Sequence, residues 1–111
     1  MKVRDVVDAL HLKVLSGEKG LDNEIEGCYV SDLLSDVMGN AEMGNLWITL
    51  QTHKNVMAIA SLKELSAVIL VKGQTASDDT LEQSNEEGIP FLSTDAETFE
   101  TAGRIYTMMH Q

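Results

Sequence analysis

Three short, largely apolar segments alternate with helical patterns in the second half of the chain, and this alternation places the fold in the α/β class. The segments are Leu46–Leu50, Ala67–Val71 and Ile89–Leu92. A strand that is apolar on both faces must be covered on both faces. Strands of this kind, separated by helices, predict a parallel sheet with right-handed crossovers and helices on each side.

The helices between and after these strands are predicted from apolar residues three or four positions apart. These residues are Val56, Ile59 and Ala60 in the first helix, Leu81 in the second, and Phe99, Ala102, Tyr106 and Met109 in the third. The run Thr94–Glu97 has the spacing of a capping box, which predicts that the third helix begins there.

The first half contains weaker signals of the same kinds. Val3–Leu10 and Leu33–Met38 have helical spacing, whereas Leu12–Leu15 and Ile25–Val30 read as strands. We expect these strands to extend the same sheet in mixed orientation. Because no linker divides the chain, residues 1–111 are predicted to form a single domain, a three-layer α/β/α sandwich with a mixed, largely parallel sheet.

Charge and apolar content limit the partners. The 111 residues include 18 acidic and 8 basic side chains, giving a net charge of −10. Such a surface repels nucleic acid and anionic membranes, so neither is expected to bind. No apolar run approaches the roughly 20 residues that span a bilayer, and no secretory leader is visible, so we expect a cytoplasmic protein.

The sequence offers no cofactor, metal or catalytic motif. Cys28 is the only cysteine, and its predicted strand position suggests a buried thiol with a raised pKa. The three histidines lack the spacing of metal ligands. Asp32 and Asp36 lie one helical turn apart, but helix capping accounts for Asp32. Because no phosphate loop or nucleophile elbow occurs, we expect no enzyme activity.

Polar loops follow each of the parallel strands, and the carboxyl ends of such strands meet at one rim of the sheet. We therefore predict a ligand site at Thr52, His53, Asn55 and Thr75. Helix capping is the competing interpretation for Thr52 and Asn55, as it is for Ser77 and Thr94.

Two longer segments resemble the DRTGG domain family. They are Gly27–Asp36, which reads GCYVSDLLSD, and Gly44–Ala60, which reads GNLWITLQTHKNVMAIA. The likeness continues through Gly88–Pro90 to Thr98 and Phe99, so it covers nearly the whole chain. It implies an α/β/α fold similar to the N-terminal domain of HPr kinase/phosphorylase, and a module found beside CBS domains in nucleotide-regulated enzymes.

The chain departs from the family in the motif that gives it its name. Where the resemblance places Asp-Arg-Thr-Gly-Gly, this sequence has Gly73-Gln-Thr-Ala-Ser77, and only Thr75 matches. A function that needs the family's arginine or glycine pair at this loop is therefore in doubt here.

Two functions remain open. The first is a regulatory or scaffold module that forms a homodimer and senses a small anion such as an adenine nucleotide. The alternative is an adaptor for a redox or iron-hydrogenase protein, which needs no small ligand. For the dimer we predict an apolar interface patch, with the acidic Asp78–Glu87 helix outside it. The patch consists of Met38, Met43, Leu46 and Trp47, and core packing is the competing interpretation for the same residues.

Overall fold

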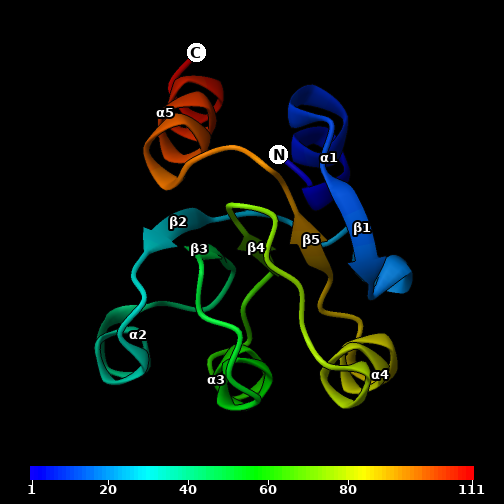
Figure 1. Ribbon diagram of the computed structural model, residues 1–111. Helices are drawn as coiled ribbons and strands as arrows, with labels where there is room; N and C mark the ends of the chain where they lie inside the picture. The colour runs from blue at the N-terminus through cyan, green and yellow to red at the C-terminus, as the bar shows by residue number, and fades with distance from the viewer.

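The computed structural model describes residues 1–111 and confirms the three-layer α/β/α fold (Figure 1). One mixed sheet has the strand order β1-β5-β4-β3-β2. Its strands are β1 (Lys13–Ser16), β2 (Gly27–Val30), β3 (Asn45–Thr49), β4 (Ala67–Leu70) and β5 (Phe91–Ser93). Only β1 runs antiparallel, beside β5, so the sheet is largely parallel as predicted.

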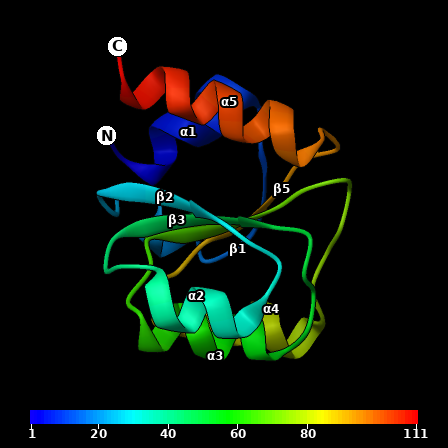
Figure 2. The same ribbon diagram turned by 90° about the vertical axis from the view of Figure 1, so that its left-hand side faces the viewer.

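Two helices cover one face of the sheet and three cover the other (Figures 1 and 2). The first layer contains α1 (Val3–Leu10) and α5 (Thr98–Met109), and the second contains α2 (Leu34–Asn40), α3 (Asn55–Leu62) and α4 (Asp78–Glu87). A short 3-10 turn, η1 (Glu18–Gly20), follows β1. No helix is both long and apolar enough to cross a membrane.

The central strands are buried on both sides, which explains their continuous apolar character. Leu46 and Ile48 of β3 pack in the cluster beneath α1 and α5. Trp47, between them, points to the other face and packs in the cluster beneath α2, α3 and α4. Alternate residues of a strand face opposite sides of the sheet, so one apolar run supplies both cores.

Helix α4 has the clearest start and stop signals. The Ser77 hydroxyl accepts a hydrogen bond from the backbone N–H of Thr80 at 3.3 Å, and Gly88 ends the helix at a φ of 68°. The predicted capping box at Thr94–Glu97 is wrong, because α5 begins only at Thr98. The Thr94 hydroxyl instead accepts from the N–H of Ala96, within the preceding loop.

The face that α5 turns to the core also differs from the prediction. Thr101 and Ile105 are buried against the sheet, whereas Phe99 is 89% exposed and Tyr106 is 65% exposed. Residues four and seven positions apart share a helix face, so the sequence pattern of Phe99 and Tyr106 does mark one face. That face points to solvent, so Phe99 and Tyr106 do not contribute to the core.

Candidate functional site

The loops after β3, β4 and β5 lie at the carboxyl end of the parallel strands (Figure 2), and a polar cleft opens there between the loops after β4 and β5 and strand β1. We call it the rim cleft, and its volume is about 620 Å³. Because β1 runs antiparallel beside β5, the start of β1 lies next to the end of β5 and forms one wall. The lining residues are His11, Lys13, Leu15, Gly73, Gln74, Thr75, Ser93, Thr94 and Asp95.

The loops after β4 and β5 are tied together by backbone hydrogen bonds. The N–H of Lys72 donates to the carbonyl of Ala96 at 3.0 Å, and the N–H of Gly73 donates to the carbonyl of Thr94 at 2.9 Å. Both donor residues have positive φ, 57° and 70°. A left-handed turn of this kind favours glycine, so Gly73 lets the chain turn sharply into the wall of the cleft.

The charges in the rim cleft are not used elsewhere in the chain. Lys13 and His11 line one wall and Asp95 lines the other, and none of the three joins an ion pair. The neighbouring Lys72 differs, since its ammonium lies 3.5 Å from the Glu97 carboxylate. The cleft therefore offers a cation, an imidazole and a carboxylate to a ligand.

The four residues predicted as a ligand site are divided between two segments. Thr75 lines the rim cleft, whereas Thr52 and His53 lie in the loop after β3 and Asn55 begins α3, and these three are exposed. His53 supplies the local cap, because its Nδ1 accepts from the N–H of Asn55 at 3.0 Å. Neither Thr52 nor Asn55 caps α3 with its side chain.

His11, Lys13 and Asp95 were not predicted as site residues. The polar loop after β5 was visible in the sequence, but nothing local pointed to the first two. His11 follows α1 at a φ of 54°, and Lys13 opens β1. Their place at the rim depends on the antiparallel pairing of Lys13 with Ser93, which joins strands about 80 residues apart. Sequence spacing carries no signal of that pairing.

Asp32 has a different role from the predicted helix cap. One carboxylate oxygen accepts from the Thr49 hydroxyl and from the N–H of Leu50, both at 2.8 Å. Helix α2 has no side-chain cap. Asp32 thus bridges the end of β2 to the end of β3, and it fixes the start of the loop that carries Thr52 and His53.

The predicted interface patch is partly wrong. Leu46 and Trp47 are completely buried in the two cores, and the Trp47 indole N–H donates to the Ser31 carbonyl at 2.8 Å. Their strand position places them inside the sheet, so they cannot meet a partner. Met38 and Met43 are exposed and remain available.

A second polar cavity and the single thiol are two further features outside the rim cleft. This cavity, of about 580 Å³, lies at the opposite, amino end of the strands, between Asn23, Ser61, Glu64 and Glu87 among others. The single thiol, Cys28, is partly buried on the edge strand β2. Burial raises its pKa to about 11, so the protonated thiol predominates at neutral pH, in agreement with the prediction.

Comparison with known proteins identifies the family. The sequence model of the DRTGG domain family matches residues 5–108, and the chain therefore belongs to this family. The fold is similar to a crystal structure of the CBS and DRTGG domains of the regulatory region of Clostridium perfringens pyrophosphatase, complexed with the activator diadenosine tetraphosphate.

That similarity has a TM-score of 0.74 at 16% sequence identity, and it covers 91% of this chain. The chain spans only 44% of the pyrophosphatase regulatory chain. At this identity the likeness establishes the fold alone. No curated protein matches the sequence.

Proposed function

We propose that this chain is a non-catalytic regulatory module that binds a small anionic metabolite, such as an adenine nucleotide, in the rim cleft. The observation that carries the proposal is the presence of Lys13 and His11 at the carboxyl rim without an ion pair. A net charge of −10 repels anions from most of the surface. A phosphate is therefore drawn to the rim cleft, where a free lysine can bind it.

Asp95 favours a nucleotide over inorganic phosphate. It lines the same cleft, and a carboxylate can accept hydrogen bonds from a ribose hydroxyl. A ligand with a phosphate at one end and hydroxyl groups at the other would satisfy Lys13 and Asp95 together. The volume of about 620 Å³ lies in the range of ordinary small-molecule sites.

The comparisons support a nucleotide as the first ligand to test. The family's name-giving motif falls, by resemblance, on Gly73–Ser77, and part of this loop lines the rim cleft. The regulatory region of the Clostridium perfringens pyrophosphatase was crystallised with diadenosine tetraphosphate, an activator. We propose Thr52, His53 and Asn55 as a second contact area for a longer ligand, because they follow the adjacent strand at the same rim.

A thermal-shift screen tests the proposal. AMP, ADP, ATP and diadenosine tetraphosphate are the probes, with inorganic phosphate as the comparison. A ligand at 100 times its dissociation constant stabilises the fold by about 2.7 kcal/mol. Lys13→Gln and Asp95→Asn should each weaken nucleotide binding at least tenfold by calorimetry. Lys63→Gln removes the same charge at the end of α3, away from the rim cleft, and serves as the matched control.

The variants Lys54→Gln and Thr52→Ala/Asn55→Ala test the second contact area. We expect a larger loss for diadenosine tetraphosphate than for AMP, because only the longer ligand would extend to this loop. Nucleotide binding that survives Lys13→Gln but is lost in Thr52→Ala/Asn55→Ala would move the site to the loop after β3. A screen without any shift would reject the nucleotide proposal.

Association with a second copy is also part of the proposal. A two-fold dimer is the expected form, because two-fold symmetry is the most frequent oligomer geometry. The adaptor alternative rests on the acidic surface, because a net charge of −10 is complementary to a basic partner. A monomeric chain that binds no nucleotide would favour that alternative, with a redox or iron-hydrogenase protein as the partner to test.

A further inference from the structure

Helix α5 carries a stripe of exposed residues along its outer face. The α5 stripe consists of Phe99, Gly103, Tyr106 and His110, and all four are exposed. At about 100° per residue they lie within an arc of about 60°, opposite the buried Ile105. The ring of Tyr106 stacks on that of His110 with centroids 4.1 Å apart, which holds the end of the stripe in one conformation.

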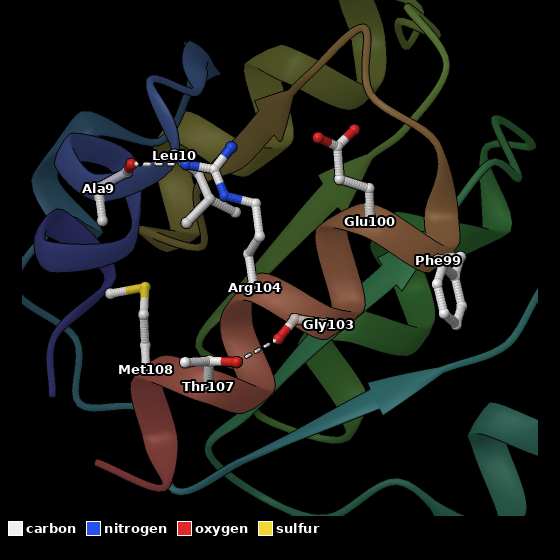
Figure 3. Close-up of a pocket in the computed structure, with 8 residues that line it drawn as sticks. All are labelled: Ala9, Leu10, Phe99, Glu100, Gly103, Arg104, Thr107 and Met108. Carbon is white, nitrogen blue, oxygen red and sulfur yellow. Dashed lines mark hydrogen bonds between the residues drawn. The ribbon is translucent and has the colours of Figure 1, made fainter.

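Grooves lie on both sides of the α5 stripe. One, of about 390 Å³, separates α5 from α1 and is lined by Leu10, Phe99 and Met108 together with polar residues (Figure 3). The other, of about 420 Å³, separates α5 from the edge strand β2, where Val30 and Met109 contribute. The stripe is thus a ridge between two partly apolar hollows, a shape into which large side chains can pack.

Gly103 has no role within the chain that requires a glycine. It lies near the middle of α5, and a Cβ built at this position meets nothing within 4 Å. Glycine in a helix interior is unfavourable, and nothing inside the monomer requires it at this position. A glycine at the crossing point of two helices allows their backbones to approach closely.

We propose that the α5 stripe is the contact surface for a second copy of this chain, with the two α5 helices packed antiparallel across a two-fold axis near Gly103. This inference gives the proposed association a definite surface. Phe99 and Tyr106 lie about 10 Å apart along the helix, and their midpoint is within one residue of Gly103. In the antiparallel arrangement Phe99 of each copy therefore lies opposite Tyr106 of the other.

Charge identifies a second copy as the occupant. Glu100 is the only acidic residue between Phe99 and Gln111, although the chain has 18 acidic residues. Two chains of −10 repel each other least through such a surface. The acidic α4, with Asp78 and Asp79 in its first turn, cannot serve in the same way.

Glu100 and Arg104 add charge complementarity that fits the same two-fold axis. They flank the stripe on the side facing α1, and their midpoint is residue 102 (Figure 3). A two-fold axis at this level brings Glu100 of one copy toward Arg104 of the other, twice per dimer. Within its own chain Arg104 forms no ion pair and donates only to the Ala9 carbonyl, at 3.4 Å.

Sedimentation at micromolar to hundred-micromolar concentration tests the proposal. We expect twice the chain mass of 12.2 kDa for the unaltered protein. Phe99→Ser should raise the dimer dissociation constant about 30-fold, because each copy loses an aromatic ring that packs opposite Tyr106 of the other. Leu62→Ser, on the exposed side of α3, removes a similarly exposed apolar side chain and should leave the mass unchanged.

Reversing the charge of Glu100 or Arg104 tests the proposed interface more specifically than Phe99→Ser does. Glu100→Arg alone and Arg104→Glu alone should each give monomers, because like charges then meet across the axis. An equimolar mixture of the two variants should form heterodimers, in which every pair is again opposite in sign. Circular dichroism confirms that each variant is folded.

Two results would overturn the proposal. A dimer that persists in Phe99→Ser and in both charge variants places the interface elsewhere, and a chain that is monomeric at the highest concentration rejects the association itself. Nucleotide binding is measured on the same samples by thermal shift. The rim cleft lies at other residues, so binding by a monomer would leave the proposed ligand function standing while this inference fails.

Discussion

The two helix layers use their aromatic side chains in opposite ways. Trp47 is completely buried beneath α2, α3 and α4, and its indole N–H is bonded to Ser31. On the other side of the sheet, Phe99 and Tyr106 of α5 point to solvent. The layer of α2, α3 and α4 packs on the largest side chain of the sheet, whereas the layer of α1 and α5 keeps two aromatic rings outside the core.

The two tyrosines show the same contrast at the level of one hydroxyl group. The Tyr29 hydroxyl donates to the Asp36 carboxylate at 2.9 Å and joins β2 to α2. The Tyr106 hydroxyl has no hydrogen bond within the chain, and its ring stacks on His110 at the surface. A side chain without an intramolecular role is the better candidate for contact with a partner, and we place the dimer surface on α5 for this reason.

Trp47→Ala should have the largest effect, a loss of about 3–5 kcal/mol in the free energy of unfolding. The cavity lies between the sheet and the layer of α2, α3 and α4, the lower layer in Figure 1, and the Ser31 carbonyl loses its donor. Phe99→Ala, measured in urea by circular dichroism at a concentration where the chain is monomeric, should change stability by less than about 0.5 kcal/mol.

If Trp47→Ala and Phe99→Ala lowered the free energy of unfolding by the same amount, the contrast between the layers would be wrong. Should Trp47→Ala fail to fold, Trp47→Phe fills most of the site and removes only the indole N–H and part of the ring. A loss of about 1–3 kcal/mol is then expected.

Asp32→Ala should cost about 1–2 kcal/mol, because it leaves the Thr49 hydroxyl and the Leu50 N–H without their shared acceptor. This variant tests whether side-chain hydrogen bonds, as well as apolar packing, contribute to the stability of the lower layer. Glu42→Ala removes an exposed carboxylate that is not hydrogen-bonded, and it should be neutral in the same urea titration. Equal stability of both variants would show that the carboxylate bridge is unimportant.

The sequence predicted the strands better than the helix faces, and packing explains why. Leu46–Leu50 and Ala67–Val71 read correctly as strands because both of their faces are buried, so nearly every residue carries the signal. In α5 only Ala102 and Met109 of the periodic apolar residues pack against the core, Phe99 and Tyr106 lie on the outer face, and the core side includes Thr101. Periodicity reports that residues share a face, but it does not say what covers that face.

The rim cleft was half predictable for a related reason. Thr75 and the loop after β5 follow parallel strands, so a general rule about sheet rims places them there. His11 and Lys13 reach the rim only because β1 pairs antiparallel with β5. That pairing depends on contacts between distant parts of the chain, which local pattern does not encode.

Gly103→Ala should raise the free energy of unfolding of the monomer by about 1 kcal/mol, since alanine is the better helix former and its methyl group meets open space. The same change should weaken the dimer, because the methyl group would separate the helices at their crossing. Gly39→Ala is the matched control in the lower layer, where added Cβ also has open space. It should stabilise the chain without changing its mass in sedimentation, and a Gly103→Ala dimer of undiminished affinity would remove Gly103 from the interface.

The smallest effect concerns the pH dependence of the lower layer. The hydroxyl groups of Ser31 and Tyr29, with the amide of Asn40, hold the pKa of Asp36 below its usual value of 3.8. A carboxylate with a depressed pKa stabilises the fold at neutral pH, and this contribution is lost as the pH falls from about 4 through the lowered pKa. Titration of the Asp36 carboxyl carbon by NMR should give a midpoint below 3.8 in the unaltered protein. Tyr29→Phe should move it upward, because one donor to the charged form is removed. Tyr106→Phe in α5 should leave this midpoint unchanged, and an equal shift in both variants would remove the distinction between the bonded tyrosine of one layer and the free tyrosine of the other.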